Sequence, residues 1–221
     1  MWDQTDRVLA LESGLSVPLA TFENSTTAMS LLREDGLILY TNAAALALFV
    51  PGKTPGELRG KFIQDLEPRD FYTERVEVLR RLAREDRNGV IRDIFDGRQI
   101  LTHVRLLPPN PDSTMRTFLC IHQLVSGEQS APDDPDVLWH EGENQDLGLL
   151  AILSKRELEV LALVGQGLTA AEIAAKLHRS EDTIKSHKSA LLRKLACKNA
   201  VQLAIIAQHA GLKLEDADRL R

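Results

Sequence analysis

The sequence predicts an α+β protein, in which an antiparallel five-stranded sheet with helices is followed by an all-α region of four helices. Two observations separate these parts. Residues 25–125 contain short apolar runs bounded by turn signals, notably Asp-Gly at 35–36 and 96–97. Residues 153–210 instead place apolar residues at helical spacing and repeat helix start signals. The order strand, strand, helices and three further strands indicates an antiparallel sheet with its helices on one side.

Charge is unevenly distributed along the 221 residues. The chain has a net charge of −5 and 43% hydrophobic residues, which fits one or two domains with sizeable cores. Residues 150–210 contain nine Lys or Arg and five Asp or Glu, so the rest of the chain carries a net charge of −9. A basic end on an acidic body is typical of a single nucleic-acid surface.

Several classes of protein are not indicated. Cys120 and Cys197 are far apart and offer neither a disulfide framework nor metal-ligand spacing. The acidic N-terminus does not read as a signal peptide, and no apolar run approaches the ~18 residues of a membrane span. We therefore expect a cytoplasmic protein without a membrane partner. The sequence contains no recognisable nucleophile–base set, P-loop or phosphotransfer histidine, so we expect no enzyme.

The first part of the chain is expected to begin with a lead-in segment, residues 1–24, that holds a short helix within 3–15 and ends near Val17-Pro18. The sheet segment follows over residues 25–125. Its expected strands are 28–32, 37–41, 90–95, 99–107 and 115–125, and its expected helices are 42–49 and 70–86, the second closed by Asn88-Gly89.

Three groups of residues in this segment carry a family resemblance. They are DGLILYTNAA at 35–44, GELRGK at 56–61 with Leu66 and Pro68 after it, and the DGR turn at 96–98. With the order of elements, they make the segment similar to a PAS domain. The resemblance implies a sensor module that binds a small ligand or a cofactor, or that dimerises.

The sequence names no cofactor, so the cofactor stays unknown. The long helix lacks the histidine of haem-binding PAS sensors, and no cysteine near it fits a flavin-adduct motif. By strand alternation His103 points to the outer face, whereas His122 shares its face with Phe118 and Cys120 and is the histidine expected nearer the cavity. A lone strand histidine is more often structural than a ligand.

Two features are expected to connect this segment to partners and to the rest of the chain. The last strand is apolar on both faces, so one face should meet the domain's own helices and the other the N-terminal helix or a second subunit. Residues 126–148 are rich in acidic residues and carry Pro132 and Pro135, which predicts an acidic linker.

The basic end carries three helix start signals. Ser154 with Glu157, and Thr169 with Glu172, each match a capping box, and Ser180 suits the N-cap of a third helix. The expected helices span 155–164, 170–177, 181–195 and 199–210.

Helical geometry sorts the third helix into two faces. Taking Ile184 as the inward direction, Leu191 and Leu195 point inward with it. The side chains that point outward are Lys185, Ser186, Ser189 and Arg193. Two short helices joined by a tight turn, the second presenting small polar and basic side chains, are typical of a helix-turn-helix that binds DNA.

The same residues carry a second resemblance. The matching positions are 153–157, Gly167, Thr169, 172–174, Leu177, Ser180, 183–185, His187, 194–195 and Asn199. They make residues 153–199 similar to the DNA-binding domain of the LuxR/FixJ family, although Ala200 stands where that family usually has a basic residue. The whole DNA-binding domain is expected to span residues 149–221. The resemblance implies base contacts by Lys185, Ser186 and Ser189. With phosphate contacts and the outward Arg193, the expected DNA-binding residues are Thr183, Lys185, Ser186, His187, Lys188, Ser189, Arg193 and Lys194.

The fourth helix has more apolar surface than a small helical core needs, and it ends at Gly211. In the family this helix is a dimer contact, so the resemblance implies the same here, shared with a role in the core. The expected dimerisation residues are Val201, Leu203, Ala204, Ile205 and Ala207.

The sequence thus predicts a dimeric transcriptional regulator that binds double-stranded DNA and is controlled by a PAS domain sensing a small ligand or a protein partner. The alternative is an interaction module, in which the PAS part dimerises with or titrates another regulator. Neutralising the basic residues of the third helix should abolish function only under the first hypothesis.

Overall fold

The computed structural model describes residues 8–10, 16–18, 22–109 and 113–219. Contacts divide the chain into two units that interleave along the sequence. The sheet unit comprises residues up to Ile91, Leu101–Gln123 and Pro132–Glu141, and the helical unit comprises Arg92–Ile100, Leu124–Ala131 and residues from Gly142 onward.

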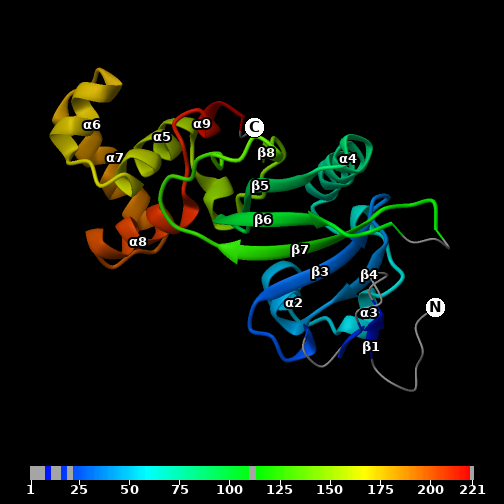
Figure 1. Ribbon diagram of the computed structural model, residues 1–221. Helices are drawn as coiled ribbons and strands as arrows, with labels where there is room; N and C mark the ends of the chain where they lie inside the picture. Colours follow the sequence, from blue (N-terminus) through cyan, green and yellow to red (C-terminus); the bar gives the residue numbers. More distant parts are fainter. Residues whose placement is uncertain (1–7, 11–15, 19–21, 110–112, 220–221) are drawn as a thin grey trace. The chain divides into compact units, whose positions relative to one another are not determined.

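The sheet has six strands in the order β4-β3-β7-β6-β5-β8 (Figure 1). Their bounds are β3 Ala28–Arg33, β4 Ile38–Thr41, β5 Asn88–Phe95, β6 Arg98–Leu106, β7 Thr117–Leu124 and β8 Val137–Glu141. The α+β fold is confirmed, but the predicted count of five strands is wrong. Strand β8 lies where the sequence predicted a linker, and its pairing satisfies backbone groups along the edge of β5. Its Leu138 is buried.

Strand β3 lies between β4 and β7 and pairs with both in antiparallel register. Ser30 is opposite Thr41 on one side and Cys120 on the other. The turn between β3 and β4 contains Gly36 at φ +88°, a conformation that favours glycine. The register therefore places Thr41, Ser30 and Cys120 side by side across three strands.

The sheet unit contains the helices α2 (Ala43–Phe49), α3 (Pro55–Leu58) and α4 (Arg69–Glu85) and the 3₁₀ turn η1 (Ile63–Asp65). Helix α2 packs on β3 and α3 on β4 (Figure 1). Asn42 is the N-cap of α2 and is fully buried. Its Oδ1 accepts hydrogen bonds from Ala45 N at 3.0 Å and from Met29 N at 3.1 Å. Its amide also donates to the Thr27 carbonyl at 2.8 Å, so one side chain joins the start of α2 to the start of β3.

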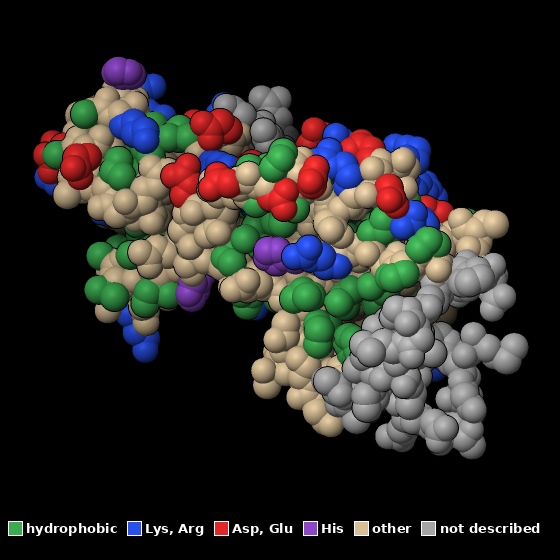
Figure 2. Space-filling view, in the orientation of Figure 1, with side chains coloured by type: hydrophobic (Ala, Val, Ile, Leu, Met, Phe, Trp, Pro, Cys, Tyr) green, Lys and Arg blue, Asp and Glu red, His purple; other side chains and the backbone are tan. Residues whose placement is uncertain are grey.

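Helix α4 is amphipathic. It buries Phe71, Val76, Leu79 and Leu82, as its apolar spacing predicts. Figure 2 shows basic and acidic side chains interspersed over the region of α4, in keeping with the Arg81–Glu85 ion pair at 2.8 Å. The helix ends where the predicted range 70–86 ends, with Asp86 as its C-cap at φ +50°. The Asn88-Gly89 pair, which is expected to close the helix, instead begins β5.

Within residues 1–24, the described stretches 8–10 and 16–18 form the short strands β1 (Val8–Ala10) and β2 (Ser16–Pro18), which pair antiparallel. The predicted helix within 3–15 is therefore wrong at residues 8–10, and its other residues lie outside the described ones. Its helical spacing rested on three apolar positions, a signal weak enough for strand pairing to override.

The helical unit contains the 3₁₀ turn η2 (Gly148–Ile152) and five helices. These are α5 (Lys155–Gly165), α6 (Ala170–Leu177), α7 (Glu181–Lys194), α8 (Ala200–Ala210) and α9 (Asp216–Arg219). Helices α5 to α8 confirm the four predicted ones. Their core holds Leu161, Ile173, Ile184 and Leu203, and Ile94 from the tip of the β5–β6 hairpin belongs to the same cluster. Among the described residues, no helix is both long and apolar enough to cross a membrane.

Candidate nucleic-acid interface

The helix-turn-helix is built from caps that the sequence predicts. Ser154 and Glu157 form a capping box at the start of α5, and Thr169 and Glu172 form another at the start of α6. In the second box, Thr169 N and Oγ1 both donate to a Glu172 carboxylate oxygen at 2.7 Å. These hydrogen bonds hold the pKa of the Glu172 carboxyl below its usual range. Each capping box therefore satisfies two backbone N–H groups at its helix start, one on the N-cap residue and one on the glutamate.

The turn between α6 and α7 is tight. Helix α6 ends at His178, which adopts a left-handed conformation at φ +52°, and Ser180 then caps α7 by accepting from Thr183 N at 3.2 Å. Ile184 and Leu191 anchor α7, because both are completely buried in the core of the helical unit. With one face fixed inward, the opposite face of α7 is held outward.

The outward face is a shallow hollow lined by Lys185, Ser186, Ser189, Ala190 and Arg193. All four residues that helical geometry sorts outward line it. Each serine hydroxyl donates back to its own helix, Ser186 to Asp182 O at 2.9 Å and Ser189 to Lys185 O at 3.0 Å. Their lone pairs remain as acceptors for base donors, and the short side chains let a duplex approach the helix closely.

The electrostatics of this face are mixed. Lys185 pairs with Glu181 at 3.0 Å, and this hydrogen bond raises the pKa of the lysine. Both groups are exposed, so the pair is weak and screened by salt. Arg193 lies two turns further along and is exposed. The exposed face of α7 thus carries one ion-paired lysine and an exposed arginine.

The expected phosphate-contacting residues divide into two groups. Thr183, His187 and Lys188 are half-buried on the flanks of the outward face. Lys194 is instead engaged within the protein, since its ammonium donates to Glu157 at 2.7 Å and to the Ile152 carbonyl at 3.4 Å.

The Lys194–Glu157 pair joins the end of α7 to the start of α5. Burial raises the pKa of the Glu157 carboxyl, but hydrogen bonds from Lys194 and Ser154 outweigh it, and the pKa lies below its usual range. Sequence reasoning missed this pair because the partners are 37 positions apart and belong to different helices. The pair orients the C-terminal end of α7.

Of the five residues of α8 that the sequence predicts to contact a second subunit, only some are exposed. Val201 and Ile205 are 66% and 46% exposed, whereas Leu203 and Ala207 are both 1% exposed and lie in the core. Leu203 and Ala207 are therefore corrected to core positions, because one helix face cannot both pack on α5 and meet a second subunit. Ala204 is partly buried against the core.

Close packing of α5 on α8 explains one glycine. A Cβ at Gly165 would lie 2.7 Å from the Ala207 carbonyl oxygen, so only glycine allows the two helices to approach this closely. The sequence predicts Gly165 as a helix stop. The structure places it as the last residue of α5, where its main role is in packing.

The sheet unit contains a chain of polar side chains. Thr41 Oγ1 lies 3.2 Å from Ser30 Oγ, Ser30 Oγ lies 3.3 Å from His122 Nε2, and His122 Nδ1 lies 3.0 Å from Thr102 Oγ1. The Phe49 ring meets the His122 ring edge-on, with centroids 4.7 Å apart. His122 thus points into the unit, as strand alternation predicts.

The comparisons with known proteins agree with this arrangement. Residues 151–207 match the model for bacterial regulatory proteins of the luxR family, and residues 19–125 match the model for the PAS fold. The chain is 32% identical to the response regulator RamR of Streptomyces coelicolor over 140 residues, which are 63% of this chain and 62% of that protein. It is 33% identical to the putative HTH-type transcriptional regulator YhjB of Escherichia coli over 49% of this chain and 53% of that protein.

The chain thus spans less than two thirds of the length of these two relatives. Among solved structures, a ligand and DNA complex of VqmA from Vibrio cholerae is similar over 92% of this chain and 91% of that one, with 16% identity and a TM-score of 0.48. Residues 151–207 are thus similar to bacterial regulatory proteins of the luxR family, and residues 19–125 are similar to the PAS fold.

Proposed function

We propose that the protein is a transcriptional regulator that binds double-stranded DNA as a homodimer and is controlled through its PAS fold. One observation carries the proposal. Lys185, Ser186, Ser189 and Arg193 share the outward face of the second helix of a helix-turn-helix, in a segment that matches the luxR family. Such a face suits the major groove, where hydroxyl and guanidinium groups can reach base edges and phosphates. Chromosomal DNA as target implies a cytoplasmic location.

The test begins with selection of bound fragments from the source genome, followed by fluorescence anisotropy of the best site at several salt concentrations. Arg193→Gln should weaken binding and reduce the slope of log affinity against log salt by about 0.9, if the arginine neutralises one phosphate. Lys53→Gln is the matched control, because Lys53 is an exposed, ion-paired residue of the sheet unit. A parent protein whose affinity does not respond to salt would exclude the proposal and leave the interaction-module alternative.

Dimerisation through α8 is part of the proposal. Val201 and Ile205 lie one helical turn apart and are exposed, so they can form a self-complementary contact across a two-fold axis. Val201→Asp with Ile205→Asp should shift the protein to monomer in analytical ultracentrifugation and weaken DNA binding. If the double variant remained a dimer, the dimer contact would lie outside α8.

The proposed input is a small ligand or a protein partner at the PAS fold. The Thr41–Ser30–His122–Thr102 chain supports recognition of a polar group, because each member can donate or accept. Native mass spectrometry of protein purified from its source should show an added mass that Thr102→Val reduces. A visible spectrum of the same sample would identify a haem or flavin. If the parent protein and Thr102→Val both carried no added mass and no visible absorption, the signal would be a protein partner.

A further inference from the structure

The helical unit contains a buried arginine that the DNA-binding face does not use. Arg92, near the tip of the β5–β6 hairpin, is 0% exposed. Its Nε donates to Gln99 Oε1 at 2.7 Å, and its Nη2 donates to the Gly211 carbonyl at 2.6 Å and to Asp216 Oδ2 at 3.3 Å. A buried guanidinium is tolerated only when it is paired and hydrogen-bonded in this way.

The partners of Arg92 fix the C-terminal end of α8. Gly211 is the C-cap of that helix, with φ +55°, and a Cβ at this position would overlap the Gln99 side chain. Asp216 also accepts from Lys213 N at 2.7 Å, which closes the turn after the helix. One arginine therefore reaches the cap of α8 and the turn that follows it.

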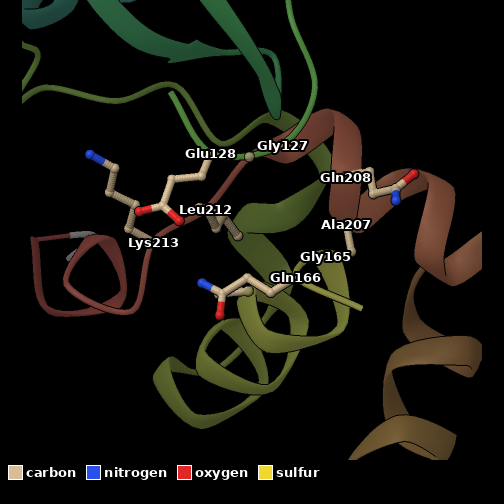
Figure 3. Close-up of a pocket in the computed structure, with 10 residues that line it drawn as sticks. Gly127, Glu128, Gly165, Gln166, Ala207, Gln208, Leu212 and Lys213 are labelled. Atoms are coloured by element: carbon tan, nitrogen blue, oxygen red, sulfur yellow. The ribbon is translucent and has the colours of Figure 1, made fainter. Parts of the chain in front are cut away.

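A second path connects Gln99 to the same helix end. Gln99 Nε2 donates to the Gly127 carbonyl at 2.8 Å, and Gly127 N donates to the Gln208 carbonyl at 3.2 Å. Figure 3 shows Gly127 beside the last turns of α8, near Gln208. Gln99 is completely buried and uses both ends of its amide. The hairpin tip thus holds the end of α8 both directly and through the segment 124–131.

We propose that Arg92 is a positioning residue, through which the β5–β6 hairpin sets the end of α8 and with it the exposed Val201–Ile205 face. The proposal rests on the proposed function and adds a route for its regulation. Strand β5 runs without interruption from Asn88–Ile91 of the sheet unit into Arg92–Phe95 of the helical unit. A shift of this strand on ligand binding would move the hydrogen-bonding groups of Arg92 relative to the α8 cap.

The test uses two variants and a control in the full chain. Arg92→Met removes the contacts, and Arg92→Met with Asp216→Leu replaces the buried pair by apolar residues, an exchange that often restores stability. Arg105→Met is the control, since Arg105 is exposed on the same hairpin. Amide hydrogen exchange of residues 207–212 should accelerate by about 10-fold or more in both Arg92 variants and stay unchanged in the control.

DNA affinity is measured well below the unfolding midpoint of each variant. The single and double variants should both bind the selected DNA about 10-fold more weakly than the parent, although the double variant recovers much of its thermal midpoint. Recovery of affinity together with the midpoint would overturn the proposal, because Arg92 would then act on stability alone. Unchanged exchange of residues 207–212 in Arg92→Met would overturn it equally. If the parent protein bound no DNA, the proposed function would be excluded. The amide hydrogen exchange of residues 207–212 would still test whether Arg92 positions the end of α8.

Discussion

Acidification should destabilise the sheet unit through His122. Burial lowers the pKa of His122 to about 3, with a smaller contribution from the positive charge of Arg75. In the unfolded chain the imidazole titrates near an ordinary pKa of about 6.5. Between these values the unfolded state binds a proton that the folded state does not, so stability falls as the pH decreases below about 6.5 and continues to fall towards about 3.

The size of the effect follows from the two pKa values. At pH 5 the unfolded histidine lies about 1.5 pH units below its pKa, which corresponds to a loss of about 2 kcal/mol relative to pH 7.5. The residue as a whole is only partly buried, so about 2 kcal/mol is an upper limit. This is a large share of the stability of an ordinary domain.

Urea titrations between pH 7.5 and 5 measure this loss, read by the fluorescence of Trp139 in β8 of the sheet unit. His122→Gln retains hydrogen-bonding capacity but cannot titrate, so its stability should vary less with pH than that of the parent. His209→Gln, at an exposed position of α8, should follow the parent. If the parent and His122→Gln lost stability in parallel, the loss would come from other groups and the assignment to His122 would be refuted.

Three further predictions concern single contacts. Asn42→Ala should destabilise the sheet unit by about 3 kcal/mol, because it removes a helix cap and leaves buried backbone groups unpaired. Urea titrations measure this loss, and an unchanged unfolding midpoint would contradict the prediction. Gly165→Ala should lower the thermal midpoint, because the added Cβ would push α5 away from Ala207 at a cost of about 2 kcal/mol. Gly167→Ala is the comparison: its added Cβ meets no atom within 4 Å, so it tests the strain of a positive φ alone. Lys194→Met should cost about 1 kcal/mol and raise the pKa of Glu157, as followed by NMR of the carboxyl group.

The locally encoded parts of the fold could be predicted from the sequence. The capping boxes at Ser154 and Thr169, the N-cap at Ser180 and the inward position of Ile184 depend on residues within one or two helical turns. They sufficed to predict the outward face of α7, because a helix with one face buried must expose the other. The central strands were predictable for a similar reason, since short turn signals separate several of them.

Contacts between distant residues could not be predicted in this way. Strand β8 forms because β5 offers an unpaired edge, a condition that the sequence around Val137–Glu141 does not contain. The exposure of α8 depends on which of its faces α5 covers, so periodicity alone could not separate Leu203 from Val201. The Arg92–Asp216 pair likewise joins two residues that no local pattern relates.

The interleaving of the two units constrains how the protein can fold during synthesis. Arg92 precedes its partner Asp216 by 124 positions. At roughly 5–20 residues per second, a ribosome needs about 6–25 s to cover that distance. Arg92 emerges from the ribosome that long before Asp216 does, so during this interval the turn that will pair with its charge has not yet emerged. The nascent chain therefore carries an arginine in β5 whose C-terminal partners are still missing, and this segment is where we expect chaperones to engage it.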